Sequence, residues 1–455
     1  MGEKRSSIAA LMDKILIIYI IINPLIDYAT GFYIREFLGA TELDIESSSF
    51  ASTPSLYIRL AMLLVFAVYL LLRREKLAIG TLVIMGAAFC ASIGVLLLTG
   101  AQLSLGTDVK YFVKYCYNIV MLFAYMSLIR SMCKNKDEFI EKIFVIVRYT
   151  CIVCALGIII PYIFSLGYYT YADRLGYRGC KGYFYSGNDI TAVFAVLLPL
   201  AAANFLSLKE RFFSGRSVAS LLAASLSVIA LFLIGSKTAF IAAIGTFGFL
   251  LIFALFSIRR HGTSYLVRML KLLLTILILL LILGCIVSFD RLVSNIVMSY
   301  EAPSVYADTE SVEVAVLSGR SDKLAQQFGL FRQGGVLTWL FGIGRSTVSN
   351  IIEMDIFEVV IYYGLVGAAA MLWLYVWLAV EFIRSLMKQF DIISFALFIG
   401  LGMSFGYLAL AGHVLFTVTS GQYFVLAIAF SRLYFAPSAE EAAIRPALIS
   451  RLLKA

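Results

Sequence analysis

Long apolar runs separated by short polar segments dominate the chain. A helix needs about 20 consecutive apolar residues to cross the hydrocarbon core of a bilayer, and runs of this length predict twelve membrane-spanning helices. We place these spans at residues 12–33, 55–72, 77–99, 111–130, 143–166, 189–207, 217–235, 237–257, 266–288, 354–380, 391–412 and 415–434. The pattern predicts an all-α fold, a polytopic membrane helix bundle that forms a single membrane domain over residues 1–455.

The composition supports a membrane protein. Apolar residues make up 61% of the 455 residues and charged residues only 14%, whereas soluble domains average roughly 45–50% and about 25%. The net charge of +9 is a feature of some nucleic-acid-binding proteins. In a membrane protein, however, basic residues collect in the cytoplasmic loops. We therefore expect membrane lipids and no nucleic acid among the partners.

The charges of the loops predict the orientation. One set of loops carries basic clusters such as Arg73 with Arg74 and Arg259 with Arg260, whereas the opposite set begins with the acidic stretch 36–46. Because lysine and arginine are enriched in cytoplasmic loops, we expect the first set, and with it both termini, in the cytoplasm.

Two segments on the predicted outer side differ from the short connections elsewhere. Residues 167–188 are dense in tyrosine and glycine, and residues 289–353 form the longest loop of the chain. Loops of that length are usually functional. Within the second loop, Leu324, Phe328 and Phe331 recur at helical intervals, which predicts a short helix lying on the membrane surface.

Six cations depart from the charge bias because they fall in predicted outer segments. They are Arg174, Arg178 and Lys181 in the 167–188 loop, Lys237 between the seventh and eighth spans, and Arg320 and Arg345 in the 289–353 loop. Such a group fits a phosphate or pyrophosphate, because arginine offers a planar fork and lysine a point charge. Ser236 is a candidate N-cap, which would place Lys237 on a helix N-terminus that favours anions. Snorkelling of single cations to lipid headgroups is the alternative.

Carboxylates follow these cations at the start of the tenth span. Glu353 and Asp355 precede Glu358 by about one helical turn, and one of them near bound cations would serve as a general base towards a sugar hydroxyl. Acidic residues that complement a helix dipole are the alternative for Asp355 and Glu358. We expect no metal, because the sequence offers no third ligand at a suitable spacing. His413, near the outer end of the eleventh span, is either functional or a packing group.

Five short motifs occur in a recognisable order. They are Gly-Ser-Lys-Thr-Ala at 235–239, Ser-Gly-Arg-Ser-Asp at 318–322, Phe-Gly-Ile-Gly at 341–344, Glu-x-Asp at 353–355 leading into Tyr-Tyr-Gly-Leu-Val-Gly at 362–367, and Gly-His-Val-Leu at 412–415. In this order they resemble the O-antigen polymerase and O-antigen ligase superfamily. The resemblance covers roughly residues 180–430, and the first half matches in topology alone.

The resemblance implies a metal-independent, cofactor-free glycosyltransferase of the bacterial cytoplasmic membrane. It would act on the outer face on glycans linked to undecaprenyl pyrophosphate, alongside a flippase and a chain-length regulator. Lys237 stands where many members carry arginine, and Arg320 matches the arginine of Ser-Gly-Arg. Gly364 and Gly367 match a Gly-x-x-Gly of the ligases, but Glu353 and Met354 replace the His-Asn pair that precedes it there.

The loss of that histidine favours a polysaccharide polymerase with Glu353 in the base position. A ligase that transfers a finished glycan to another acceptor is the nearest alternative. A transporter or lipid flippase is a third, although transporters usually show internal repeats and charges near the midplane of the bilayer. Asp27 and Arg148 are the span residues that would suit transport.

Overall fold

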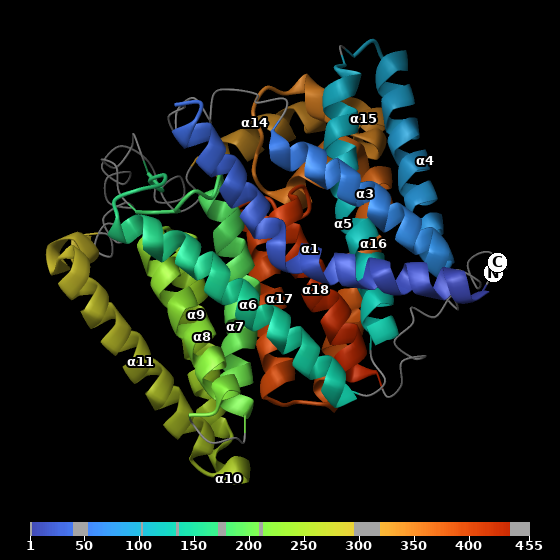
Figure 1. Ribbon diagram of the computed structural model, residues 1–455. Coiled ribbons are helices and arrows are strands. Elements are labelled where there is room, and N and C mark those ends of the chain that lie inside the picture. The colour runs from blue at the N-terminus through green and yellow to red at the C-terminus, as the bar shows by residue number, and fades with distance from the viewer. Residues whose placement is uncertain are drawn as a thin grey trace.

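The computed structural model describes residues 2–39, 53–101, 103–132, 136–171, 179–208, 213–294 and 319–436. Over these residues the protein is all-helical, with fifteen α-helices and no strands. The predicted polytopic helical bundle is therefore confirmed (Figure 1).

Each predicted span coincides with one long helix. These are α1 (Gly2–Glu36), α3 (Pro54–Arg73), α4 (Lys76–Leu98), α5 (Leu105–Met132), α6 (Lys136–Ile163), α7 (Gly187–Ser207), α8 (Gly215–Ile234), α9 (Lys237–Phe256), α11 (Ser264–Val287), α16 (Asp355–Lys388), α17 (Ile392–Leu410) and α18 (Val418–Phe435). All except α18 are among the eleven described helices that are long and apolar enough to cross a membrane.

Helix α18 differs because it is enclosed by protein. All of its residues except Arg432 and Phe435 are buried, including the polar Thr419 and Gln422. It packs against α5, α7, α16 and α17. A helix that touches protein rather than lipid does not need an apolar surface all round, which explains how α18 accommodates these polar residues.

The outer layer of the bundle has the opposite character. Helices α3 and α11 are only 22% buried over their most apolar windows, and α4 is 28% buried. Their exposed side chains are large and apolar, such as Leu64, Val83 and Leu274. These helices therefore present the surface that a bilayer would cover, and α11 lies at the edge of the bundle (Figure 1).

Short helices lie between the long ones. Helix α10 (Ile258–His261) joins α9 and α11, and α14 (Arg320–Gln333), α15 (Gly335–Phe341) and the 3-10 turn η1 (Arg345–Thr347) precede α16. Helix α14 contains Leu324, Phe328 and Phe331, so the short helix predicted from their spacing is confirmed for secondary structure. Helices α14 and α15 lie beside the end of the bundle at which α4 ends and α5 begins (Figure 1).

Two glycine-dependent features shape this end of the bundle. Helix α8 ends at Gly235 in a left-handed conformation (φ 68°), and Ser236 caps α9 by accepting a hydrogen bond from the Ala239 N–H (3.2 Å). The tight turn that results needs glycine because a side chain disfavours positive φ. Helix α16 is unwound at Gly364, whose φ is 67°.

Candidate active site

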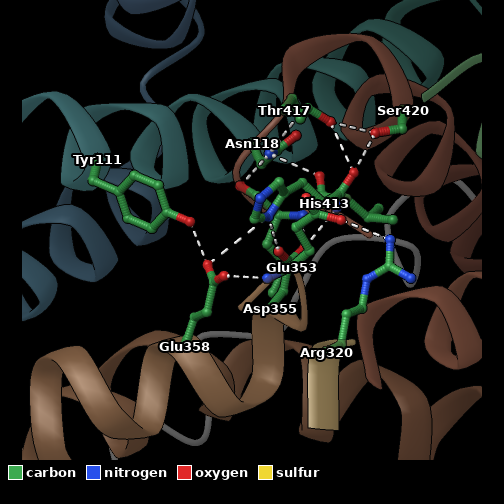
Figure 2. A network of polar contacts seen from close by, with 11 residues as sticks. Tyr111, Asn118, Arg320, Glu353, Asp355, Glu358, His413, Thr417 and Ser420 are labelled. Carbon is green, nitrogen blue, oxygen red and sulfur yellow. Dashed lines mark hydrogen bonds and ion pairs between the residues drawn. The ribbon is translucent and has the colours of Figure 1, made fainter. Parts of the chain in front are cut away.

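The polar network of Figure 2 forms where α16 begins and where the segment 411–417 connects α17 to α18. This segment passes over the first turn of α16, so His413 faces Asp355 and Glu358. Arg320, at the start of α14, approaches the same place through Glu353. Residues from three separate parts of the chain therefore meet at one end of the bundle.

Asp355 is the buried anchor of the network. Its side chain is fully buried, and one oxygen accepts hydrogen bonds from the backbone N–H groups of Val414 and Leu415 (2.6 Å each). The other oxygen contacts Nδ1 of His413 at 2.8 Å. A buried carboxylate needs such partners because an unpaired charge is costly away from water. Asp355 therefore fixes the position of His413.

His413 carries a positive charge at neutral pH. Burial alone would lower its pKa, but the hydrogen bond to Asp355 and the negative charges of Asp355, Glu358 and Glu353 outweigh burial and raise the pKa to about 9. Its Nδ1 also lies 3.8 Å from Oε2 of Glu358. The imidazolium is thus surrounded by three carboxylates.

Glu358 links the network to α5 and to the loop before α16. One carboxylate oxygen accepts a short hydrogen bond from the Tyr111 hydroxyl, and the other accepts from the backbone N–H of Glu353 (2.7 Å). Glu358 is fully buried. Asp355 and Glu358 thus both contact distant segments of the chain. Complementing the helix dipole is therefore not their only interaction.

Glu353 is the more accessible carboxylate and pairs with Arg320. The ion pair measures 2.6 Å, and the Glu353 side chain is 37% exposed whereas that of Arg320 is 13% exposed. Burial raises the pKa of Glu353, but the charge and hydrogen bond of Arg320 outweigh it and hold the pKa below its ordinary value. Glu353 has a φ of 65°, which is strained for a residue other than glycine. In this conformation its N–H donates to Glu358.

Lys237 is the first residue of α9, directly after the capping Ser236. Arg320 is close enough that the two positive charges act on each other. The structure thus pairs Arg320 with Glu353 and places Lys237 within electrostatic range of Arg320. These three predicted site residues lie up to 116 positions apart in the chain.

Arg345 lies in the wall of the site. It is buried, its Nη1 donates to the Val348 carbonyl (2.5 Å), and its guanidinium lies 5.7 Å from the ring centre of Tyr111 and 5.8 Å from that of Tyr362. These cation–π contacts support the same Tyr111 that binds Glu358.

The third group of predicted cations is only partly described. Lys181 lies over the ring of Tyr168, 5.8 Å from its centre, and Arg35 approaches the same ring at 5.0 Å. Arg174 and Arg178 lie outside the described residues.

Asp355, Glu358 and His413 also satisfy a minimal geometry for a metal site. Their ligand atoms lie within 4.8 Å of one another, in the part of the chain that the structure describes. Two carboxylates and an imidazole suit several divalent metals. The same atoms, however, already form the hydrogen bonds to backbone N–H groups, Tyr111 and each other described above. Metal-independent chemistry therefore stays a prediction.

A second layer of polar contacts holds the 411–417 segment. Asn118 of α5 donates to the carbonyls of Leu415 (2.6 Å) and Thr417 (3.2 Å), and Ser420 donates to that of His413 (2.9 Å). Gly421 lets α18 approach closely, because a Cβ there would lie 2.1 Å from Oδ1 of Asn118. Sequence reasoning missed Asn118 and Tyr111. The signal for Asn118 was an amide in the middle of a predicted span.

The chain is similar to one known family of membrane proteins. The model described as "O-antigen ligase like membrane protein" matches residues 9–305, which is more than half of the chain. The chain belongs to this family. This O-antigen-ligase-like protein is thus a multi-pass membrane protein of a glycan-processing family, for which lipid-linked glycans are the implied substrates. No curated protein matched the chain.

The family model covers a different part of the chain from the motifs that carry the resemblance described above. It covers the first half of the protein, where we expected topology alone to agree, and it ends before Arg320. Lys237 lies inside the matched range, whereas Glu353, Asp355 and His413 lie beyond it. Geometry therefore carries the argument for these last residues.

Proposed function

We propose that the protein is a bacterial membrane glycosyltransferase that polymerises undecaprenyl-pyrophosphate-linked repeat units into a surface polysaccharide. The reaction would take place at the outer face of the cytoplasmic membrane. The observation that carries the proposal is the Arg320–Glu353 ion pair, with Lys237 and the charged His413 beside it. Together these residues offer cations that would bind a pyrophosphate and a carboxylate that would accept the proton of a hydroxyl.

The proposed chemistry is a single displacement at the sugar. A hydroxyl of the acceptor attacks the anomeric carbon of the donor, and the bond from that carbon to the pyrophosphate oxygen breaks. The pyrophosphate leaves with the electron pair, and Glu353 takes the hydroxyl proton. Arg320 and Lys237 stabilise the charge that develops on the leaving group.

Binding of the donor would also activate the base. In the structure Arg320 keeps Glu353 ionised but weakly basic, because the guanidinium stabilises the carboxylate. A pyrophosphate that draws the hydrogen bonds of Arg320 to itself removes this stabilisation. The pKa of Glu353 then rises only when the donor is in place.

His413 and Asp355 would have supporting roles. Asp355 has no exposed surface, so we assign it to positioning His413. The imidazolium acts electrostatically on Glu353, and adds a third positive charge to the site. Glu353 in place of the ligase histidine favours polymerase over ligase within the family.

Reconstitution with a lipid-linked repeat unit tests the proposal. Purified protein should convert single repeats into a ladder of longer lipid-linked chains, and the ladder should persist in excess chelator. Loss of the ladder on chelation, with rescue by a divalent cation, would assign a metal to Asp355, Glu358 and His413. A protein that lengthens nothing would contradict the proposal and favour transport.

A deletion strain separates polymerase from ligase. Without a polymerase, single repeats remain on the lipid carrier, whereas without a ligase long chains accumulate on it. The chain-length regulator and the flippase of such a pathway remain proposed partners.

A further inference from the structure

A second group of cations lies on the α5 side of the site, and the reaction above gives it no role. Lys110 and Lys114 stand one helical turn apart on α5, and Tyr111 between them binds Glu358. Figure 2 shows Tyr111 and Arg320 on opposite sides of His413. The two lysines thus belong to the helix that flanks the catalytic residues opposite Arg320.

Lys110 and Lys114 form an exposed strip in the N-terminal part of α5, a helix that is enclosed over most of its remaining length. Both are exposed, whereas Tyr111, Tyr115 and every residue from 117 to 129 are buried. The strip begins at the N-terminal end of α5 and ends at Lys114. Within the described residues, neither ammonium group has a hydrogen bond or an ion pair.

Lys114 is exposed, yet it interacts with charged groups of the bundle. The charges of Asp189 on α7, Arg59 on α3 and Arg345 all act on it. Asp189 lies in the first turn of α7 and is itself only partly buried. Snorkelling to lipid headgroups alone would not explain its interactions with these charged groups of the protein.

Arg59 adds a guanidinium to this group. Its Nη2 donates to Asp27 of α1 (2.7 Å) and to Thr419 of α18 (2.6 Å). Its Nε is buried and has no partner among the described residues. Asp27 and Asp189 neutralise only part of the positive charge of Arg59, Lys110 and Lys114. An excess of cations beside the polar site of a membrane protein favours the binding of an anion.

We infer that Lys110, Lys114 and Arg59 form a second anion-binding subsite, which takes the pyrophosphate of the acceptor glycan. This rests on the proposed function, because the acceptor of a polymerase is itself lipid-linked. Asp189 connects the two subsites, since both His413 and Lys114 act on its charge. The donor pyrophosphate would then lie at Arg320 and Lys237, and the acceptor pyrophosphate on the other side of His413.

Equilibrium binding of radiolabelled farnesyl diphosphate, a short lipid diphosphate, to the purified full-length protein tests this inference. The wild type should bind two equivalents. Lys114→Gln and Arg320→Gln should each weaken one of the two events about tenfold or more and leave the other unchanged. Lys388→Gln, an exposed lysine at the far end of α16, is the matched control and should bind as the wild type does.

Two outcomes would overturn the inference. One is a single binding event that Lys114→Gln leaves intact in a variant that purifies and unfolds like the wild type. The other is that phosphatidylglycerol occupies the second subsite and farnesyl diphosphate does not bind there. The subsite would then hold ordinary lipid headgroups. Binding needs no turnover, so two diphosphate sites without chain growth would contradict the polymerase proposal alone.

Discussion

Glu353 and His413 carry opposite charges at neutral pH for different reasons. Glu353 is ionised because Arg320 stabilises its carboxylate, while His413 is protonated because Asp355 and two further acids surround it. The charge of each residue at neutral pH thus depends on its neighbours. Substitution of one member should therefore alter the behaviour of the others.

Arg320→Ala should lower the rate of chain elongation by about 10²–10³-fold, because a donor that stabilises developing charge typically contributes this much. The protein should stay in the membrane at normal amounts, since Arg320 lies at the start of α14 rather than within a span. Polymer length in cells and immunoblots of membranes measure the two effects. Arg332→Ala, an exposed arginine of the same helix, is the control. Normal polymer in Arg320→Ala would count against the site.

His413 should make stability depend on pH. Its pKa is raised from 6.5 to about 9 on folding, so its contribution is complete below pH 6.5, declines as the pH rises and is lost above pH 9. The contribution amounts to at most about 3 kcal/mol. Thermal unfolding of wild type and His413→Gln from pH 6 to 10 measures it. The difference between them should shrink with rising pH, and a constant difference would refute the charge assignment.

Helices α15 and α16 act as one unit around the break at Gly364. The unwound turn leaves the carbonyls of Ile361 and Tyr362 available, and they accept hydrogen bonds from the N–H groups of Ile343 (2.9 Å) and Gly344 (3.0 Å). The Phe-Gly-Ile-Gly and Tyr-Tyr-Gly-Leu-Val-Gly motifs are therefore two halves of one contact. This contact holds the first turn of α16, and with it Asp355 and Glu358.

Gly364→Ala should destabilise the protein by about 1–3 kcal/mol or more, because alanine disfavours positive φ and its Cβ would lie 2.4 Å from the backbone of Leu340. Elongation should fall as well, since the start of α16 would shift. Gly402→Ala on α17, where no atom lies within 4 Å of a new Cβ, is the control. Equal unfolding temperatures for the two variants would contradict the proposed contact.

The helices could be predicted from the sequence because each apolar run fixes one span by itself. The convergence of Lys237, Arg320 and Glu353 could also be predicted, since the charge bias assigned all three to the same side of the bundle. Tyr111 and Asn118 could not. Tyr111 binds a carboxylate 247 positions away, and Asn118 binds carbonyls almost 300 positions away. Their partners depend on which helices pack together, which apolar periodicity does not specify. Arg59 and Lys114 were missed for the same reason.

At the scale of the whole molecule, one end of the bundle carries all described members of the site. Asp355 begins α16 there, and Lys388 ends the same helix at the opposite end. The proposed orientation therefore assigns opposite sides of the membrane to these two ends. The Arg384 and Lys388 pair lies at the end that we expect in the cytoplasm.

Single cysteines introduced into a cysteine-free variant test this orientation. Ser349→Cys, an exposed position near the site, should react with a membrane-impermeant maleimide in intact cells. Lys388→Cys should react only after the membrane is permeabilised. The reverse pattern would place the site on the cytoplasmic side and remove the basis for an outer-face reaction.

The enclosure of α18 has a consequence for biosynthesis. Because protein rather than lipid covers nearly all of its surface, this helix gains its stability from α5, α7 and α17, which are made before it. During synthesis the preceding spans would thus already be inserted. His413, however, would have no fixed position until α18 packs against them. A chain interrupted after residue 417 keeps His413 but lacks α18, and it should therefore reach the membrane in a form unable to carry out the proposed elongation, which would protect the lipid carrier from premature reaction.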